Sequence, residues 1–156
     1  TTAEDDLLFC LLHDNRVASP LAQIFDPTWL NLDIPAGRIL AKIMAETKAD
    51  GPIEPNRMEE FLEDDSERNV FQQNFFQEVS SFDENSFLQH TNECLLALFI
   101  RSIKQKEKRI LTDLENSSDQ SDLLSTLRSE LLELRKNRKN PPQLIFSDQH
   151  TRYSHA

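Results

Sequence analysis

Two cysteines and two histidines are spaced in a way that could bind a metal ion. Cys10 and His13 are three residues apart, and His90 and Cys94 are four apart, so each pair would share one face of a helix. Two thiolates with two imidazoles suit tetrahedral zinc, although four protein ligands would close the site to a substrate. Free cysteine is more often a small core residue, and a chain of this length folds without zinc. We therefore predict no metal site and keep a zinc hydrolase built on these four residues as the enzymatic alternative.

The sequence offers little for other chemistry. Its only two glycines are Gly37 and Gly51, which excludes the glycine-rich loops that bind nucleotide phosphates. Acidic residues at positions 59–60 and 63–65 could hold cations, but carboxylate metal centres in helical bundles use Glu-x-x-His pairs, and the sequence contains none. The strand-to-helix turn that carries a serine nucleophile is also absent. We predict that the chain is not an enzyme and binds no cofactor.

The composition restricts the class of partner. With 156 residues and a formal net charge of -10, the chain fits one domain without broad attraction to nucleic acid or anionic lipid. The charge is uneven: residues 1–85 carry 6 basic and 18 acidic side chains, a balance of -12, and residues 86–156 carry 11 and 9, a balance of +2. The sequence contains no run of 18 apolar residues and so predicts no membrane-spanning helix. Its two cysteines are too few for a disulfide framework. We expect a cytoplasmic protein that does not contact the membrane.

A local basic patch is expected in the C-terminal half, where two runs of Lys and Arg would meet in a helical hairpin. Such a run is more often a solvated helix face than a binding site for nucleic acid or an acidic partner. The two runs are Arg101, Lys104, Lys106, Lys108 and Arg109, and Arg135, Lys136, Arg138 and Lys139.

We predict an all-α fold, because glycine is scarce and the helix-forming residues Leu, Glu, Lys and Gln are abundant. Residues 1–85 should form a bundle of short helices. Thr2 caps the first helix, which ends near His13, and later helices begin near the prolines at positions 20, 27, 35 and 55. A further amphipathic segment follows, with apolar positions at Val70, Phe71, Phe75, Phe76 and Val79.

Residues 86–139 should form a long helix and a C-terminal antiparallel helical hairpin. Residues 116–119 are typical of a turn between a helix over residues 86–115 and a returning helix over residues 123–138. Four leucines of the returning helix fall within about 80° of one another, the width of a packing seam, and Leu132 lies outside them. Residues 140–156 form a tail, in which residues 144–146 are either a docking peptide or disordered. The seam leucines are Leu123, Leu127, Leu131 and Leu134.

The order of these elements resembles the C-terminal helicase-binding domain of bacterial DNA primase, over residues 3–139. Three stretches carry the resemblance: the acidic and leucine-rich opening at residues 4–12, the triplet at residues 38–40, and above all the leucine-rich run at residues 123–135. Their order and spacing, more than any single motif, make the resemblance.

The resemblance implies a domain without catalytic residues. It would dock on the N-terminal domains of the hexameric replicative DNA helicase and couple primer synthesis to unwinding, while the polymerase and the zinc-dependent template reader lie in preceding domains of a primase. We expect the partner contact on the second face of the returning helix, because Leu132 adds apolar surface outside the seam. The predicted partner-binding residues are Leu124, Arg128, Leu132 and Arg135.

Two departures from the family pattern leave alternatives open. Asn15-Arg16 stands where the family often has proline after the first helix. A second stretch is similar to the N-terminal domain of the replicative helicase itself: Gly51-Pro52-Ile53-Glu54 followed by Met58, Phe61 and Leu62. Because the two domains share a fold, that helicase domain, which assembles in a ring and binds primase, is the first alternative. A helical adaptor unrelated to replication is the second.

Overall fold

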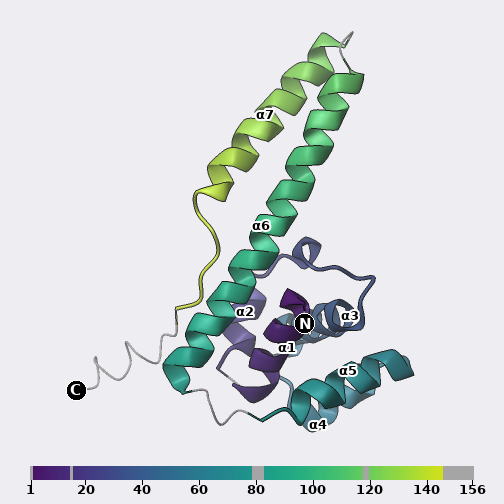
Figure 1. Cartoon of the computed structure of the whole chain (residues 1–156), viewed down its shortest axis with the longest axis vertical. Coiled ribbons are helices and arrows are strands. Elements are labelled where there is room, and N and C mark those ends of the chain that lie inside the picture. Colours follow the sequence, from purple (N-terminus) through teal and green to yellow (C-terminus); the bar gives the residue numbers. More distant parts are fainter. Residues whose placement is uncertain (1, 15, 79–82, 118–119, 146–156) are drawn as a thin grey trace, which may run out of the picture.

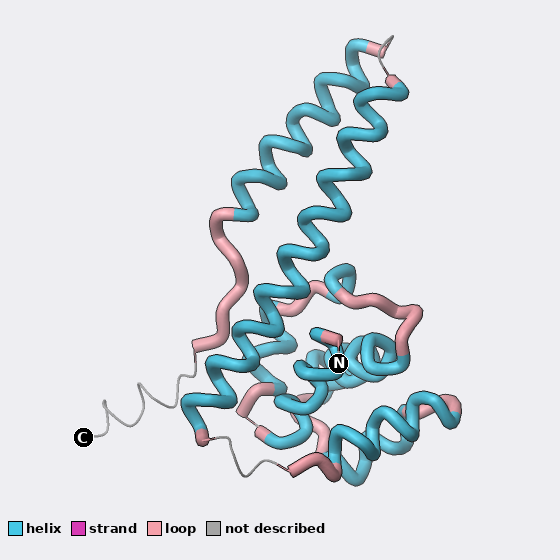
Figure 2. The backbone as a smooth tube through the Cα atoms, viewed as in Figure 1, coloured by secondary structure: helices cyan, strands magenta, loops and turns pink. Residues whose placement is uncertain are grey.

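The fold is all-helical, as predicted. A computed structural model describes residues 2–14, 16–78, 83–117 and 120–145, and these contain no β-strand. Figures 1 and 2 show a compact bundle of N-terminal helices, from which two long helices project side by side. None of the described helices has both the length and the hydropathy needed to span a membrane. The elements are α1 (Ala3–His13), α2 (Ala18–Ile24), the 3-10 turn η1 (Pro27–Trp29), α3 (Pro35–Asp50), α4 (Pro55–Met58), the 3-10 turn η2 (Glu59–Phe61), α5 (Asp65–Phe75), α6 (Glu84–Asn116) and α7 (Ser121–Arg138).

Side-chain caps and prolines begin these helices where the sequence predicts them. Thr2 caps α1 through reciprocal hydrogen bonds, in which the Asp5 amide donates to Thr2 Oγ1 at 3.1 Å and the Thr2 amide donates to the Asp5 carboxylate at 3.3 Å. Pro27, Pro35 and Pro55 each occupy the first turn of a helix, where no intrahelical partner needs their missing amide hydrogen. Local sequence therefore accounts for most helix starts in the bundle.

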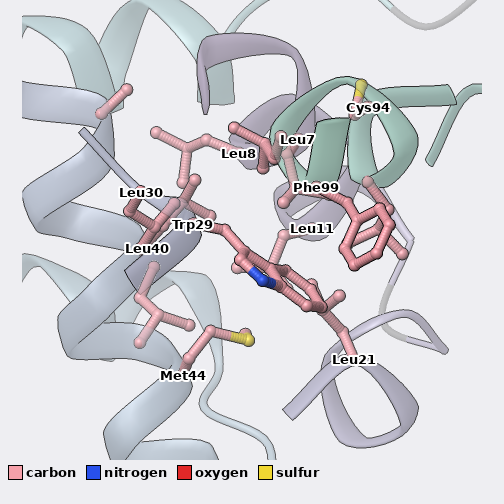
Figure 3. Packing of buried hydrophobic residues seen from close by; sticks show 14 of the residues in the cluster. Leu7, Leu8, Leu11, Leu21, Trp29, Leu30, Leu40, Met44, Cys94 and Phe99 are labelled. Carbon is pink, nitrogen blue, oxygen red and sulfur yellow. The ribbon is translucent and has the colours of Figure 1, made fainter. Parts of the chain in front are cut away.

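Trp29 lies at the centre of the bundle core. Its ring makes edge-on contacts with Phe25 and with Phe99 of α6, at centroid distances of 5.3 and 5.8 Å. Figure 3 shows the leucines of α1 on one side of this ring and Leu40 and Met44 of α3 on another. α1 is the central helix, because its buried residues occupy almost its whole circumference: Leu7, Leu8, Phe9, Cys10, Leu11 and Leu12.

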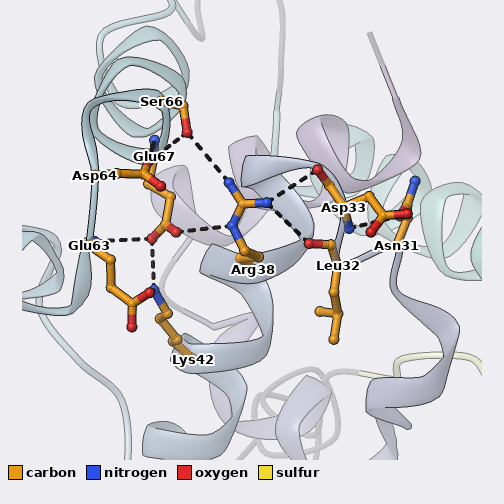
Figure 4. A network of polar contacts seen from close by, with 9 residues as sticks. All are labelled: Asn31, Leu32, Asp33, Arg38, Lys42, Glu63, Asp64, Ser66 and Glu67. Atoms are coloured by element: carbon orange, nitrogen blue, oxygen red, sulfur yellow. Dashed lines mark hydrogen bonds and ion pairs between the residues drawn. The ribbon is translucent and has the colours of Figure 1, made fainter.

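Glu67 of α5 is a buried carboxylate that ties α5 to α3. Only 1% of its side chain is exposed, and it accepts hydrogen bonds from Arg38 Nε at 3.1 Å and Lys42 Nζ at 2.8 Å (Figure 4). Arg38 also donates to two carbonyl oxygens in the loop before α3. Burial alone would raise the pKa of the Glu67 carboxyl, but the hydrogen bonds from Lys42 and Arg38 outweigh it and hold that pKa below its ordinary value.

α6 is one continuous helix of 33 residues that contributes to both parts of the molecule. Its first half packs on α1 of the bundle, and its second half packs on α7 (Figure 1). The predicted long helix and returning helix are therefore confirmed. On α7, the seam leucines Leu127, Leu131 and Leu134 are buried, whereas Leu123 in the first turn is 39% exposed.

Phe76 does not join the buried face of its segment, and this part of the prediction is wrong. At about 100° per residue, Phe76 lies roughly 140° around the helix from the buried Phe71, so helical periodicity itself turns it away from the core. Phe76 is 74% exposed, and its ring lies 5.1 Å from that of Phe75 between centroids. Val79, predicted on the same face, lies outside the described residues.

The first part of the C-terminal tail packs back on α6. Leu144 is buried, its amide donates to Asn92 Oδ1 at 2.7 Å, and its carbonyl oxygen accepts from Asn92 Nδ2 at 3.2 Å. Figure 1 shows the chain after α7 running back along α6 toward the bundle. Leu144 thus docks within its own chain, while residues 146–156 lie outside the described part.

Candidate functional site

The α7 outer face, defined here as Leu124, Arg128, Leu132 and Arg135, is the predicted partner-binding surface. Leu132 is 69% exposed, the two arginines are exposed, and Leu124 is half-buried. At about 100° per residue, Leu132 lies roughly 140° around the helix from Leu127 in the middle of the buried seam. The Leu132 side chain therefore lies outside the packing seam. That a partner protein binds it stays a prediction.

The charges of the α7 outer face are positive and weakly paired. Arg135 Nε lies 3.9 Å from Glu107 Oε2 of α6, which is too long for a hydrogen bond. More than half of the Arg135 side chain is exposed, so this ion pair contributes little to stability in water. Arg128 makes no ion pair with any residue that the structure describes. The face thus presents one leucine beside two guanidinium groups.

The predicted basic patch is not uniform. A shallow groove between α6 and α7 is lined by Lys106 and Arg109 on one side and by Glu130 and Glu133 on the other, so opposite charges face each other there. Arg101, the first member of the predicted patch, belongs instead to an ion pair with the bundle.

Glu4 and Arg101 form the ion pair that joins α1 to α6. The Glu4 side chain is completely buried and accepts hydrogen bonds from Arg101 Nη1 at 3.1 Å, from Arg101 Nη2, and from the Asn31 amide at 2.7 Å. Arg101 Nη2 also donates to the Trp29 carbonyl oxygen at 2.9 Å. Burial alone would raise the pKa of the Glu4 carboxyl, but the hydrogen bonds from Arg101 and Asn31 hold it below its ordinary value.

Comparison with known proteins does not place the chain in a family: no family model matches it, and no curated protein or solved structure matches it. The functional argument therefore depends on the motifs of the sequence and on the geometry of this chain. In that geometry, a second cluster of chemically competent side chains lies apart from the hairpin, between α1 and the first half of α6.

The four residues predicted as a zinc set are only partly brought together. Cys10 of α1 and Cys94 of α6 are both buried, and their thiols are close enough to alter each other's pKa. His13 points elsewhere, because its Nε2 lies 2.8 Å from the Asn74 carbonyl oxygen, to which a ring nitrogen can only donate. Its ring contacts Phe9 and Phe75. Cys10, His13, His90 and Cys94 do not meet at one point among the described residues, so the predicted set of four zinc ligands is not formed.

Asp6, and not His13, is the residue of α1 that lies near His90 and Cys94. Ligand atoms of Asp6, His90 and Cys94 all lie within 4.8 Å of one another. Asp6 precedes Cys10 by four residues, just as His90 precedes Cys94, so each helix offers two side chains on one face. Sequence reasoning missed Asp6 because an acid in the first turn of a helix is already explained by the helix dipole. The signal that could have found it is the four-residue spacing to Cys10.

The two thiols have different proton affinities. Interaction with Cys10 and burial both raise the pKa of Cys94. Interaction with Cys94 lowers the pKa of Cys10 in spite of its burial.

Proposed function

We propose that this chain is a non-catalytic interaction domain of a bacterial DNA primase, which binds the hexameric replicative DNA helicase in the cytoplasm and couples primer synthesis to unwinding. The proposal is supported by the primase-like order of motifs at residues 4–12, 38–40 and 123–135. The helical bundle with a projecting hairpin agrees with that order of elements.

The observation that carries the proposal is the exposed apolar side chain on the α7 outer face. Burying a leucine side chain is favourable by about 1.5–3 kcal/mol, and Leu132 leaves most of that free energy unused within the chain. An amphipathic helix of this kind binds by laying its exposed residues against another helical domain. The hairpin holds α7 away from the bundle, so a partner can reach this face (Figure 1).

The charges around Leu132 favour an acidic helical surface as its partner. Arg128 and Arg135 flank the leucine with two positive charges, and guanidinium groups pair well with carboxylates at interfaces. The strongly acidic residues 1–85 would repel the same partner surface, which confines the contact to the hairpin.

Sedimentation velocity of the chain alone, and mixed with the replicative helicase of the same organism, tests the proposal. We expect a monomer that co-sediments with the helicase hexamer. We expect Leu132→Asp to weaken this binding by about tenfold or more, since a central apolar anchor is worth at least about 1.4 kcal/mol.

Thr126→Asp is the matched control, because it adds the same charge to an exposed position of α7 about 120° around the axis from Leu132. It should bind as the unaltered chain does. Full affinity in Leu132→Asp would show that another face binds the helicase. Self-association without helicase binding would favour the N-terminal domain of the helicase, and a monomer that ignores the helicase would favour an unrelated adaptor.

A further inference from the structure

Three side chains with metal-binding atoms, Asp6, His90 and Cys94, lie together where α1 packs on the first half of α6, and Cys10 follows Asp6 by one turn of α1. Asp6 and Cys10 come from one helix, and His90 and Cys94 come from the other. We propose that these four residues bind one zinc ion, which joins the two helices. The site is distinct from the α7 outer face and does not depend on the proposed function.

The distances are close to those that a tetrahedral site needs. With zinc bonds of about 2.3 Å to sulfur and about 2.0–2.2 Å to nitrogen and oxygen, neighbouring ligand atoms stand roughly 3.3–3.8 Å apart. Ligand atoms of Asp6, His90 and Cys94 are already within 4.8 Å of one another. Movements of about 1 Å would bring these three atoms to zinc-binding separations, and the Cys10 sulfur, which lies outside the group, must also move toward them.

Cys10 supplies the fourth ligand. It follows Asp6 by one turn on the same face of α1 and is close enough to Cys94 for the two thiols to alter each other's pKa, although its sulfur lies outside the 4.8 Å group of the other three atoms. Zinc binding forms two zinc–sulfur bonds, and the two thiol protons pass to solvent. The site is then closed by four protein ligands, as structural zinc sites are.

The ligand types select zinc over the common hard cations. Two sulfurs and one imidazole nitrogen suit zinc, whereas magnesium and calcium take oxygen ligands almost exclusively. Glu93 Oε2 lies 3.8 Å from His90 Nδ1, beyond hydrogen-bond distance, so it would have to move closer to orient a zinc-bound imidazole as an outer carboxylate does. Asp6 and His90 are partly exposed, which gives the ion a path to the buried sulfurs.

Cobalt provides a direct spectroscopic test on the full chain kept reduced with a phosphine. Co²⁺ bound by this set should give the intense visible bands of a tetrahedral ion and a near-ultraviolet thiolate-to-cobalt band, saturating at one equivalent. Zn²⁺ should displace it and raise the temperature of unfolding, because it binds the folded state. Cys10→Ser should roughly halve the thiolate band by leaving one of the two sulfur ligands.

His90→Ala and Cys94→Ser should each weaken Co²⁺ binding by about 100-fold or more, exceeding the loss seen when an outer-shell partner is removed. His90 is partly exposed, so its variant tests the site even if Cys94→Ser fails to fold. His13→Gln is the matched control and should bind normally, because it keeps a donor for the Asn74 carbonyl. No bound cobalt, a weak octahedral spectrum, a thiolate band unchanged in Cys10→Ser, or a Cys10–Cys94 disulfide in place of metal would each overturn the proposal.

Discussion

The carboxylate of Glu4 and the guanidinium of Arg101, 97 residues apart in the sequence, form a two-pronged ion pair between the first turn of α1 and the middle of α6. The pair also fixes the loop after η1, because Asn31 donates to Glu4 and Arg101 donates to the Trp29 carbonyl oxygen. A single contact thus connects three segments around the bundle core. Its removal should affect the whole bundle.

Arg101→Met should lower the free energy of unfolding by about 3 kcal/mol, because the buried Glu4 charge loses its counter-ion. Glu4→Gln should cost less, about 1.5–2 kcal/mol, since the amide oxygen can still accept from Asn31. Urea unfolding of the two single variants and the double variant measures the coupling. The double variant should lose clearly less than the sum of the single losses, and strict additivity would contradict the pairing.

The stability of the chain should fall in acid. The folded-state pKa values of Glu4 and Glu67 are held below the ordinary glutamate value, so the ionised carboxylates stabilise the folded state. This contribution is complete above the ordinary glutamate pKa of about 4.3 and is lost as the pH falls through the lower folded values.

The measurement is the urea midpoint as a function of pH, from neutral pH downward. Glu67→Gln should flatten this dependence, because one of the two depressed carboxyls no longer titrates. Glu63→Gln, at a side chain that is 73% exposed, is the control and should keep the dependence of the unaltered chain. An equally steep decline in Glu67→Gln would argue against the assigned role of Glu67.

Gly37→Ala should destabilise the chain by about 3 kcal/mol or more. A Cβ at position 37 would stand 1.9 Å from the Asn31 carbonyl oxygen, so the first turn of α3 and the loop before it would have to separate. Gly51→Ala is the comparison: its φ of 88° favours glycine, but an added Cβ meets no atom within 4 Å, which leaves a backbone cost of about 1–2 kcal/mol. Thermal unfolding of both variants should rank Gly37→Ala as the less stable, and the reverse order would contradict the close approach.

Leu127→Ala and Leu132→Ala should have different effects on stability, because they lie on opposite sides of α7. Leu127 is buried against α6, so its truncation should cost about 2 kcal/mol or more of unfolding free energy. Leu132 is mostly exposed, and its truncation should change stability by less than about 0.5 kcal/mol. A large loss in Leu132→Ala, measured by urea unfolding, would mean that Leu132 packs within the chain and is not free for a partner.

Leu144→Ala should loosen the start of the tail from α6. The substitution removes buried apolar surface worth at most about 2 kcal/mol, and it weakens the two hydrogen bonds with Asn92 that depend on this docking. Faster amide hydrogen exchange at Leu144 is the direct readout. Ile145→Ala is the neighbouring control, because Ile145 is 66% exposed and should have little effect.

The sequence predicts those features that depend on neighbours along the chain. Thr2, Pro35 and the leucine spacing of α7 act within one helix or its cap, and the structure places them as expected. The exposed position of Leu132 follows from the same periodicity. Helix type, helix order and the inner and outer faces of α7 could therefore be predicted from the sequence, whereas the exposed position of Phe76 was not.

The contacts between helices could not be predicted, because the register of one helix against another is set by packing across the core. His13 shares a helix with Cys10, yet its ring turns to Asn74 while Asp6 approaches His90 and Cys94. Glu4 is similarly an ordinary first-turn acid in the sequence, and only the fold reveals Arg101 as its partner. Helical periodicity specifies the direction of a side chain, and not the residue that it meets.

The continuity of α6 has a mechanical consequence. At about 1.5 Å per residue, its 33 residues form a rod roughly 50 Å long, without the proline or glycine at which helices usually bend. A load applied near the tip of the hairpin is therefore carried along this rod as a torque on the α1–α6 contact. The ion pair of Glu4 with Arg101 lies at this contact. We therefore expect a force applied to the hairpin to be felt most strongly by the ion pair.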